Sequence, residues 1–272
     1  MEDPASRSDG SLRRRGWLTH PGALLVFGLS LPSAVLAQTV HPPPPPPEWT
    51  GSVAAGLSLT KGNSDTMLLT LSGRATKKWD LNELSLGAIG AYGEDSGDVN
   101  NKMASAFAQY NRLFTERWYG YARVDGLYDG IAGVDYRFTL GVGLGYYFIK
   151  TTNTLLSVEA GPGYVIERLE GSQGTGTNKV TVIENNDYWT FRAAQKFERK
   201  FNDHVRIWES VEFLPQLDHV SNFIVNGECG VESALTKTWS LRVVLQDTYD
   251  NEPAPGRENN DLKLVAGVGW KF

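Results

Sequence analysis

Cysteine is almost absent from this sequence: Cys229 is the only one in 272 residues, and there are only four histidines. One thiol cannot form an intrachain disulfide or a metal centre built from several cysteines. The histidines are His20, His41, His204 and His219, too few and too scattered to suggest a histidine-rich metal site. We therefore expect no metal and no other cofactor.

The sequence also lacks long runs of like charge and long apolar runs. The 26 basic and 31 acidic residues are interspersed and give a net charge of −5, so no long basic run points to nucleic acid as a partner. No apolar run reaches the roughly 20 residues that a transmembrane helix needs. The mean hydropathy of −0.30 is typical of a soluble protein. A membrane β-barrel has such an average too, because its strands alternate apolar with polar residues.

Residues 1–37 have the three regions of an export signal. Arginines 13–15 precede an apolar stretch, 23–37, that ends with Val35 and Ala37. A basic region, a short apolar region and small residues at positions −3 and −1 are typical of a secretory signal peptide. We expect cleavage after Ala37; an uncleaved anchor is the alternative.

A run of six prolines, 42–47, dominates the next segment, 38–48. Such a run forms a polyproline II rod of about 19 Å, at ~3.1 Å per residue. We interpret the segment as a stiff, proline-rich periplasmic spacer. A motif that docks a partner is the alternative.

From residue 49 onward, apolar and polar residues alternate, and turn residues interrupt the alternation. A period of two is typical of β-strands with one apolar face. Tyr136, Phe138, Leu140 and Val142, for example, would share one face of a strand. The pattern predicts twelve strands: 50–60, 66–78, 83–93, 102–114, 117–129, 135–149, 154–168, 187–200, 204–216, 222–235, 238–249 and 261–272.

Two kinds of connection alternate between these strands. One kind is tight, such as "TE" at 115–116, and the other is mostly longer and rich in Gly, Asn, Asp and Pro, such as "NEPAPGREN" at 251–259. Outer-membrane barrels have short periplasmic turns and longer outer loops in this alternation. The sequence therefore predicts an all-β protein, a transmembrane antiparallel up-and-down β-barrel of about twelve strands over 49–272, in the bacterial outer membrane. A soluble periplasmic β-protein that binds a ligand is the alternative.

The last strand ends on an aromatic residue at the chain terminus. Its alternate positions Leu264, Ala266, Val268, Trp270 and Phe272 are all apolar. We expect this face to contact outer-membrane lipid and lipopolysaccharide, with the terminal rings at the periplasmic interface. A C-terminal Phe on an alternating strand also resembles the sorting signal that the barrel-assembly machinery reads, so we expect that machinery as a partner.

Charged residues of both signs fall on the face opposite to the apolar one. Barrels of about 8 strands are filled by side chains, whereas 16–18 strands leave a channel. Twelve strands leave both interpretations open: a water-filled passage for small ions or solutes, or paired charges that fill the barrel. One charge, Glu209, falls in the lipid-facing frame, so either it lies near the membrane surface or a β-bulge resets the register. The inward charges are Arg74, Arg123, Asp125, Arg137, Glu159, Glu167, Arg192, Lys196, Arg206, Glu212, Glu228, Glu232, Arg242 and Lys263.

One short motif suggests catalysis. In "DHVSN", His219 and Ser221 are two residues apart, a spacing similar to that of the outer-membrane phospholipase A motif. A serine esterase needs a base beside its hydroxyl and a third group that orients the base. Ser233 stands where that phospholipase has its Asn partner, so we interpret the motif as a polar outer loop. An esterase remains the alternative function.

Three further segments resemble a known family: "TKGNSDT" at 60–66, "YDNEPAPGRENND" at 249–261 and the terminal "GVGWKF". They are similar to a Gram-negative outer-membrane family of unknown function labelled salt-induced outer-membrane protein, domain of unknown function family 481. The resemblance covers roughly 49–272 and implies an outer-membrane barrel. It implies no catalytic residues and no substrate. We expect a narrow pore or an envelope structural or stress protein, without catalysis.

Overall fold

The computed structural model describes residues 48–60, 66–173 and 180–272. The predicted signal peptide, the proline run and the hairpin residues 61–65 lie outside the described residues. The described chain contains twelve β-strands. They are β1 (Trp49–Thr60), β2 (Thr66–Trp79), β3 (Asn82–Asp95), β4 (Asp98–Leu113), β5 (Trp118–Asp129), β6 (Val134–Lys150), β7 (Thr154–Gln173), β8 (Val180–Lys200), β9 (Val205–Pro215), β10 (Phe223–Ala234), β11 (Trp239–Asp250) and β12 (Asn260–Lys271).

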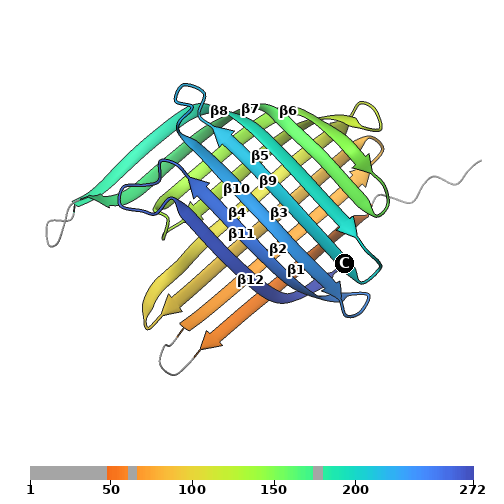
Figure 1. Ribbon diagram of the computed structural model, residues 1–272, viewed down its shortest axis with the longest axis horizontal. Coiled ribbons are helices and arrows are strands. Elements are labelled where there is room, and N and C mark those ends of the chain that lie inside the picture. Colours follow the sequence, from red (N-terminus) through yellow and green to blue (C-terminus); the bar gives the residue numbers. More distant parts are fainter. Residues whose placement is uncertain (1–47, 61–65, 174–179) are drawn as a thin grey trace, which may run out of the picture. The chain divides into compact units, whose positions relative to one another are not determined.

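The strands form one closed antiparallel barrel (Figure 1). Each strand pairs with its neighbours in the sequence, and β12 pairs with β1 to close the ring. The predicted all-β, up-and-down barrel of twelve strands is therefore confirmed. Among the described residues, no helix is long and apolar enough to span a membrane.

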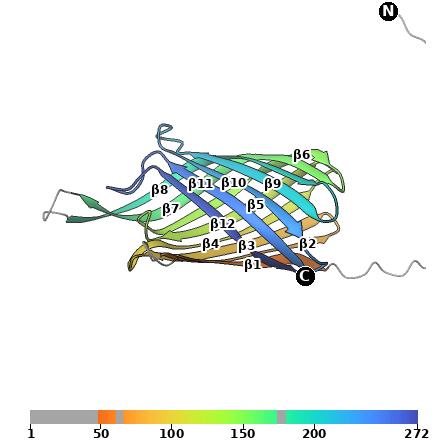
Figure 2. The same cartoon turned by 60° about the horizontal axis from the view of Figure 1, so that its bottom comes forward.

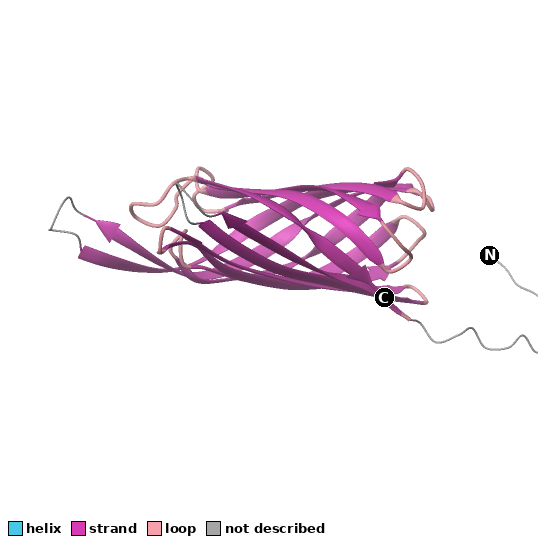
Figure 3. Ribbon diagram, turned by 90° about the horizontal axis from the view of Figure 1, so that it is seen from below, coloured by secondary structure: helices cyan, strands magenta, loops and turns pink. Residues whose placement is uncertain are grey.

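The longest strands, β7 and β8, extend beyond their predicted ends at 168 and 187. They stay paired as far as Gln173 and Val180, and in Figures 2 and 3 they project past the other strands at the end opposite the C-terminus. The residues by which the two strands exceed the prediction, 169–173 and 180–186, show no regular alternation of apolar and polar residues. Only the base of this hairpin, at Leu169, packs into an apolar cluster with Val134 and Ala254. The rest projects past the other strands (Figure 3), where alternation is not required, so the strand signal is missing.

One outer connection is shorter than predicted. Residues 95–101 were expected to form a loop, but β3 and β4 pair up to Asp95 and Asp98, which leaves only Ser96 and Gly97 in the turn. Both have positive φ angles, 53° and 90°. Two central residues with positive φ make the tight hairpin turn that matches the twist of paired strands.

The outer surface of the barrel is apolar. Phe138, Leu140, Val142 and Leu144 alternate along β6 and are all exposed. Glu209 lies on the same outer face: β9 pairs with β8 and β10 without a register shift, and the side chain is exposed. The alternative of a bulge that turns Glu209 inward is thus wrong.

The chain terminus closes the periplasmic end of the barrel. The Phe272 amide donates to the Gly51 carbonyl, and the Gly51 amide donates back to the Phe272 carbonyl, both at 3.1 Å. A Cβ atom at Gly51 would lie 2.7 Å from the Phe272 ring, so a residue without a side chain is needed there. The apolar positions Leu264, Ala266, Val268, Trp270 and Phe272 are all exposed on the outer face.

Candidate functional site

The interior of the barrel holds the densest set of charged side chains. All the inward charges that the alternation identified lie on the inner face of their strands, and most are paired with one another. Most of the paired charges fall into three groups along the barrel, which we call the mid-lumen network, the periplasmic network and the outer-mouth pairs. Among the described residues, no group of three His, Cys, Asp or Glu side chains is placed to hold a metal ion.

The mid-lumen network centres on Arg192 of β8. Its guanidinium lies 2.8 Å from the Glu159 carboxylate of β7 and 2.5 Å from the Glu212 carboxylate of β9. Glu159 also accepts hydrogen bonds from Gln109 Nε2 of β4 at 2.7 Å and from the Tyr119 hydroxyl of β5 at 3.0 Å. The network therefore ties five strands together through one buried arginine and one buried carboxylate.

The periplasmic network centres on Glu232 of β10, which is 1% exposed. Arg206 of β9 and Arg242 of β11 approach its carboxylate to 3.2 Å and 2.6 Å, and Lys271 of β12 forms a further ion pair with it. Arg242 also donates to the Ser52 hydroxyl of β1 at 2.8 Å. These contacts join the last strands of the barrel to the first one.

The outer-mouth pairs cross the lumen. Arg137 of β6 pairs with Glu167 of β7 and, at 2.9 Å, with Asp250 of β11, while Lys263 of β12 pairs with Asp129 of β5 at 2.8 Å. In the closed strand order, β6 and β11 are five strands apart, and so are β12 and β5. These two contacts therefore bridge nearly opposite walls.

A loop lies over the same end of the barrel. Residues 251–259, which we call the outer strap, connect β11 to β12 but pack against β6 and β7. Ala254 is 3% exposed in a cluster with Val134 and Leu169, and the Ser172 amide donates to the Pro255 carbonyl at 3.0 Å. The strap thus spans part of the outer mouth.

The wall formed by β1 to β4 is different. Arg74 of β2 faces the interior, 5.4 Å from the Phe107 ring, yet its side chain is exposed. Among the described residues no carboxylate lies within 4.0 Å of it. Its inward neighbours on β1 and β2 are small: Ser52, Ala54 and Ser72. An exposed side chain on an inner wall means that the lumen has open space beside Arg74.

The "DHVSN" residues lie in the exposed connection between β9 and β10. His219 Nδ1 is 3.7 Å from a Glu252 carboxylate oxygen of the outer strap. The Ser221 carbonyl accepts a hydrogen bond from Asn251 Nδ2 at 2.7 Å. The hydrogen bonds among the described residues do not join the His219 imidazole to the Ser221 hydroxyl. The esterase hypothesis stays a prediction.

The alternating pattern did not identify several residues that take part in these networks. Asp129 is the last residue of the predicted strand 117–129 and Asp250 follows the predicted strand 238–249, so neither was named as an inward charge. Gln109 and Tyr119 carry no charge. Lys271 lies in the inward frame of the terminal strand, and that frame was the available signal. The sequence does not show which charges form ion pairs across the lumen.

Comparison with known proteins fits this geometry. The model of a family described as "Protein of unknown function, DUF481" matches residues 53–272. The chain belongs to this family. The match spans nearly the whole barrel, and the description of the family assigns it no role. A comparison with curated protein sequences finds no significant relative.

Solved structures with some likeness include two porins. The NanC porin aligns with 82% of this chain and 100% of its own, at 9% identity and a TM-score of 0.46. The KdgM porin aligns with 83% and 99%, at 8% identity and a TM-score of 0.41. The translocator domain of the autotransporter NalP from Neisseria meningitidis aligns with 82% and 87%, at 12% identity and a TM-score of 0.44. At these values the likeness carries no argument about function.

Proposed function

We propose that the protein is a narrow, non-catalytic outer-membrane pore that passes small ions and solutes along the wall of β1 to β4, with a preference for anions. The observation that carries this proposal is Arg74, an exposed arginine inside the barrel with no carboxylate within ion-pair distance among the described residues. Burying a charge without a partner costs several kcal/mol. Water must therefore reach Arg74, and a water-filled lumen provides a path for ions.

The paired charges set the width of the route. On the side of β5 to β11, Glu159, Arg192 and Glu232 are buried and joined to partners, so that half of the lumen is filled. The pairs Arg137–Asp250 and Lys263–Asp129 narrow the outer mouth from wall to wall. The passage is then restricted to solutes smaller than those that a wide, water-filled barrel admits.

The preference for anions follows from the sign of the lumen charges that are exposed to water and lack a close ion pair. In a narrow pore, selectivity reflects the charges on the wall. Most lumen charges are neutralised by their partners. Arg74 is not, and Lys196, 40% exposed, has its nearest carboxylate oxygen 3.9 Å away on Glu159. Among the described residues, the inward Glu228 carboxylate accepts hydrogen bonds from the neutral Trp208 and Gln246 side chains and has no ion pair. The two cations outnumber this one carboxylate, so the balance of the charges without a close ion pair is positive.

The test is the reversal potential of the barrel in a planar bilayer under a salt gradient. Arg74→Glu places a negative charge in the passage, so we expect selectivity to move toward cations. Arg112→Glu is the matched control: Arg112 is exposed near the periplasmic end of β4, on the outer face, where it donates to Asn82. An equal shift in both variants, or no shift in Arg74→Glu, would refute the assignment of Arg74 to the conducting path.

The proposal includes the route to the membrane. The export signal is cleaved after Ala37, the barrel-assembly machinery recognises the strand that ends at Phe272, and lipid and lipopolysaccharide surround the apolar outer face. The exposed alternate residues of β12 support the last two points. Sequencing the N-terminus of the mature protein from outer membranes tests the first: Gln38 is the expected first residue.

A further inference from the structure

The closure between β1 and β12 is incomplete. Among the described residues, the two strands pair over four positions, from Ser52 with Lys271 to Ala55 with Val268. Both strands continue toward the outer end, because β1 stays paired with β2 as far as Thr60 and β12 stays paired with β11 as far as Asn260. Beyond the four positions, two strand edges therefore face each other unpaired. We call this gap in pairing the seam.

Two glycines mark the start of the seam. A Cβ atom at Gly56 would lie 2.4 Å from the Ala266 carbonyl oxygen, and one at Gly267 would lie 2.5 Å from the Ala55 carbonyl oxygen. The two backbones are thus in contact at this level. Side chains here would force the two backbones apart, so glycine is needed at both positions for this close approach.

The seam lies at membrane depth. Leu57 of β1 and Leu262 and Leu264 of β12 flank it, and their outward side chains are 63%, 64% and 64% exposed. Such exposed leucines suit contact with lipid. Lipid-exposed open strand edges are not tolerated in the hydrocarbon region, because their N–H and C=O groups have no partner; irregular backbone occurs there only where it lines a cavity. Something must therefore occupy the space beside these edges.

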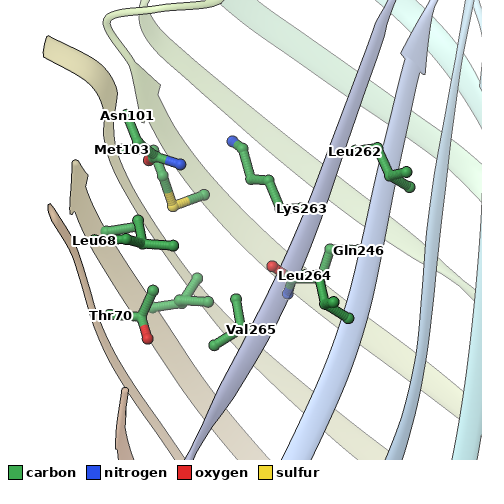
Figure 4. A pocket seen from close by; sticks show the side chains of 11 residues that line it. Leu68, Thr70, Asn101, Met103, Gln246, Leu262, Lys263, Leu264 and Val265 are labelled. Atoms are coloured by element: carbon green, nitrogen blue, oxygen red, sulfur yellow. The ribbon is translucent and has the colours of Figure 1, made fainter. Parts of the chain in front are cut away.

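A cavity of about 160 Å³ lies beside the seam (Figure 4). In Figure 4, Lys263 and Val265 point from β12 toward Leu68 and Met103, while Leu262 points to the other side of the strand. All five residues border the cavity. Because alternate residues of a strand face opposite sides, a cavity bordered by 262–265 reaches the edge of β12 and is not confined to the lumen.

The lining of this cavity is unusual for the inside of a barrel. Leu68, Ile89, Met103 and Val265 face inward, although the interior of an outer-membrane barrel is typically polar. Ligand pockets are lined mainly by apolar side chains with a few polar groups, so this lining suits an apolar ligand. Lys263, which pairs with Asp129 at 2.8 Å, supplies a positive charge at the rim.

We propose that this cavity binds an unbranched hydrocarbon chain that enters sideways from the outer leaflet through the seam. The volume is close to that of an engineered apolar cavity of about 150 Å³ that takes up benzene. It accommodates the end of a chain, and the rest lies in the seam between β1 and β12. The chain belongs either to a membrane lipid or to a free single-chain amphiphile such as a fatty acid.

The experiment is photolabelling of the wild-type barrel in phospholipid vesicles. One arm uses palmitate with a terminal diazirine, and the other uses phosphatidylethanolamine with the same group on one acyl chain. We expect adducts at Met103 and at 262–265, located by mass spectrometry of peptides. Adducts with palmitate alone assign the site to free amphiphiles, and adducts with the phospholipid alone assign it to membrane lipid; both outcomes support the proposal.

Two variants separate the cavity from the lipid-facing surface. Ala91→Phe fills the cavity, whose lining includes Ala91, and should abolish labelling at Met103. Ala88→Phe is the matched control, since Ala88 lies on the outer face of the same strand. Labelling that survives in Ala91→Phe, or that spreads evenly over the outward residues of all strands, would overturn the proposal.

Closing the seam tests the route. The register that ends at Ala55 and Val268 would place Leu57 opposite Ala266 if it continued. A disulfide between Leu57→Cys and Ala266→Cys, in a Cys229→Ser background, should abolish labelling, and a reductant should restore it. Unchanged labelling of the oxidised form would exclude entry through the seam. Cross-linking of two barrels through these cysteines would instead show that a second chain covers the edges, which also overturns the proposal.

Discussion

Replacement of Arg192 by Gln should strongly destabilise the barrel. The Arg192 and Glu159 side chains are each 3% exposed and the Glu212 side chain is 19% exposed, so water screens their charges poorly. Removing one partner of a buried ion pair costs about 3–5 kcal/mol. Here one substitution removes the closest cation of two carboxylates: Glu212 loses its ion-pair partner, and Glu159 keeps only Lys196, at 3.9 Å.

The surrounding hydrogen bonds moderate this cost. Glu159 keeps its bonds from Gln109 and Tyr119, and Glu212 keeps one from Asn226 at 3.2 Å. We therefore expect a loss of about 3–5 kcal/mol for Arg192→Gln rather than the sum for two broken pairs. Arg192→Glu, which adds a third carboxylate, should cost more. It should reduce folding rather than leave a folded barrel with altered selectivity.

The assay is equilibrium unfolding in urea of barrels refolded into lipid bilayers. The folded fraction is read from heat-modifiable migration on gels. Arg74→Gln is the control, because Arg74 lies in the same lumen without a carboxylate within 4.0 Å among the described residues, and we expect it to stay within about 1 kcal/mol of the wild type. Equal stability of the Arg192→Gln and Arg74→Gln barrels would refute the reasoning that the mid-lumen network holds the wall together.

Three further predictions concern other parts of the chain. Deletion of Phe272 removes both hydrogen bonds to Gly51 and should leave degraded or aggregated chain in the periplasm, whereas normal barrel yield would mean that the terminal residue is dispensable. Glu209→Leu removes an exposed carboxylate from the lipid-facing surface and should stabilise the barrel by about 1–2 kcal/mol; a loss of stability would show that Glu209 has a partner. Because no hydrogen bond among the described residues joins His219 to Ser221, we expect no phospholipase activity, and hydrolysis that disappears in Ser221→Ala would establish the esterase instead.

The alternation of the sequence was enough to predict twelve strands and the face on which each side chain lies. A period of two depends only on the local backbone, so Arg192 and Glu212 could be placed inside without knowledge of the barrel. The ion pair between these two residues could not be predicted in the same way. It depends on how far adjacent strands slide past each other, and this stagger is set when the sheet closes.

Contacts across the lumen were even harder to predict from the sequence. Arg137 and Asp250 are 113 residues apart, and only the closed ring brings their strands face to face. The seam was invisible for a related reason: the sequence of β12 alternates without interruption through Leu264 and Val268, so nothing in it indicates where pairing with β1 ends. The inward Leu68 and Met103 were the one available sign, since apolar residues in a polar frame are out of place in a lumen.

The most direct test of the proposed pore is single-channel recording of the refolded wild-type barrel in a planar lipid bilayer. We predict discrete, small conductance steps with a preference for anions, because Arg74 is exposed in a lumen in which most other charges are paired. Barrels that insert in folded form and show no conductance at any salt concentration would contradict the pore and leave a structural role in the envelope.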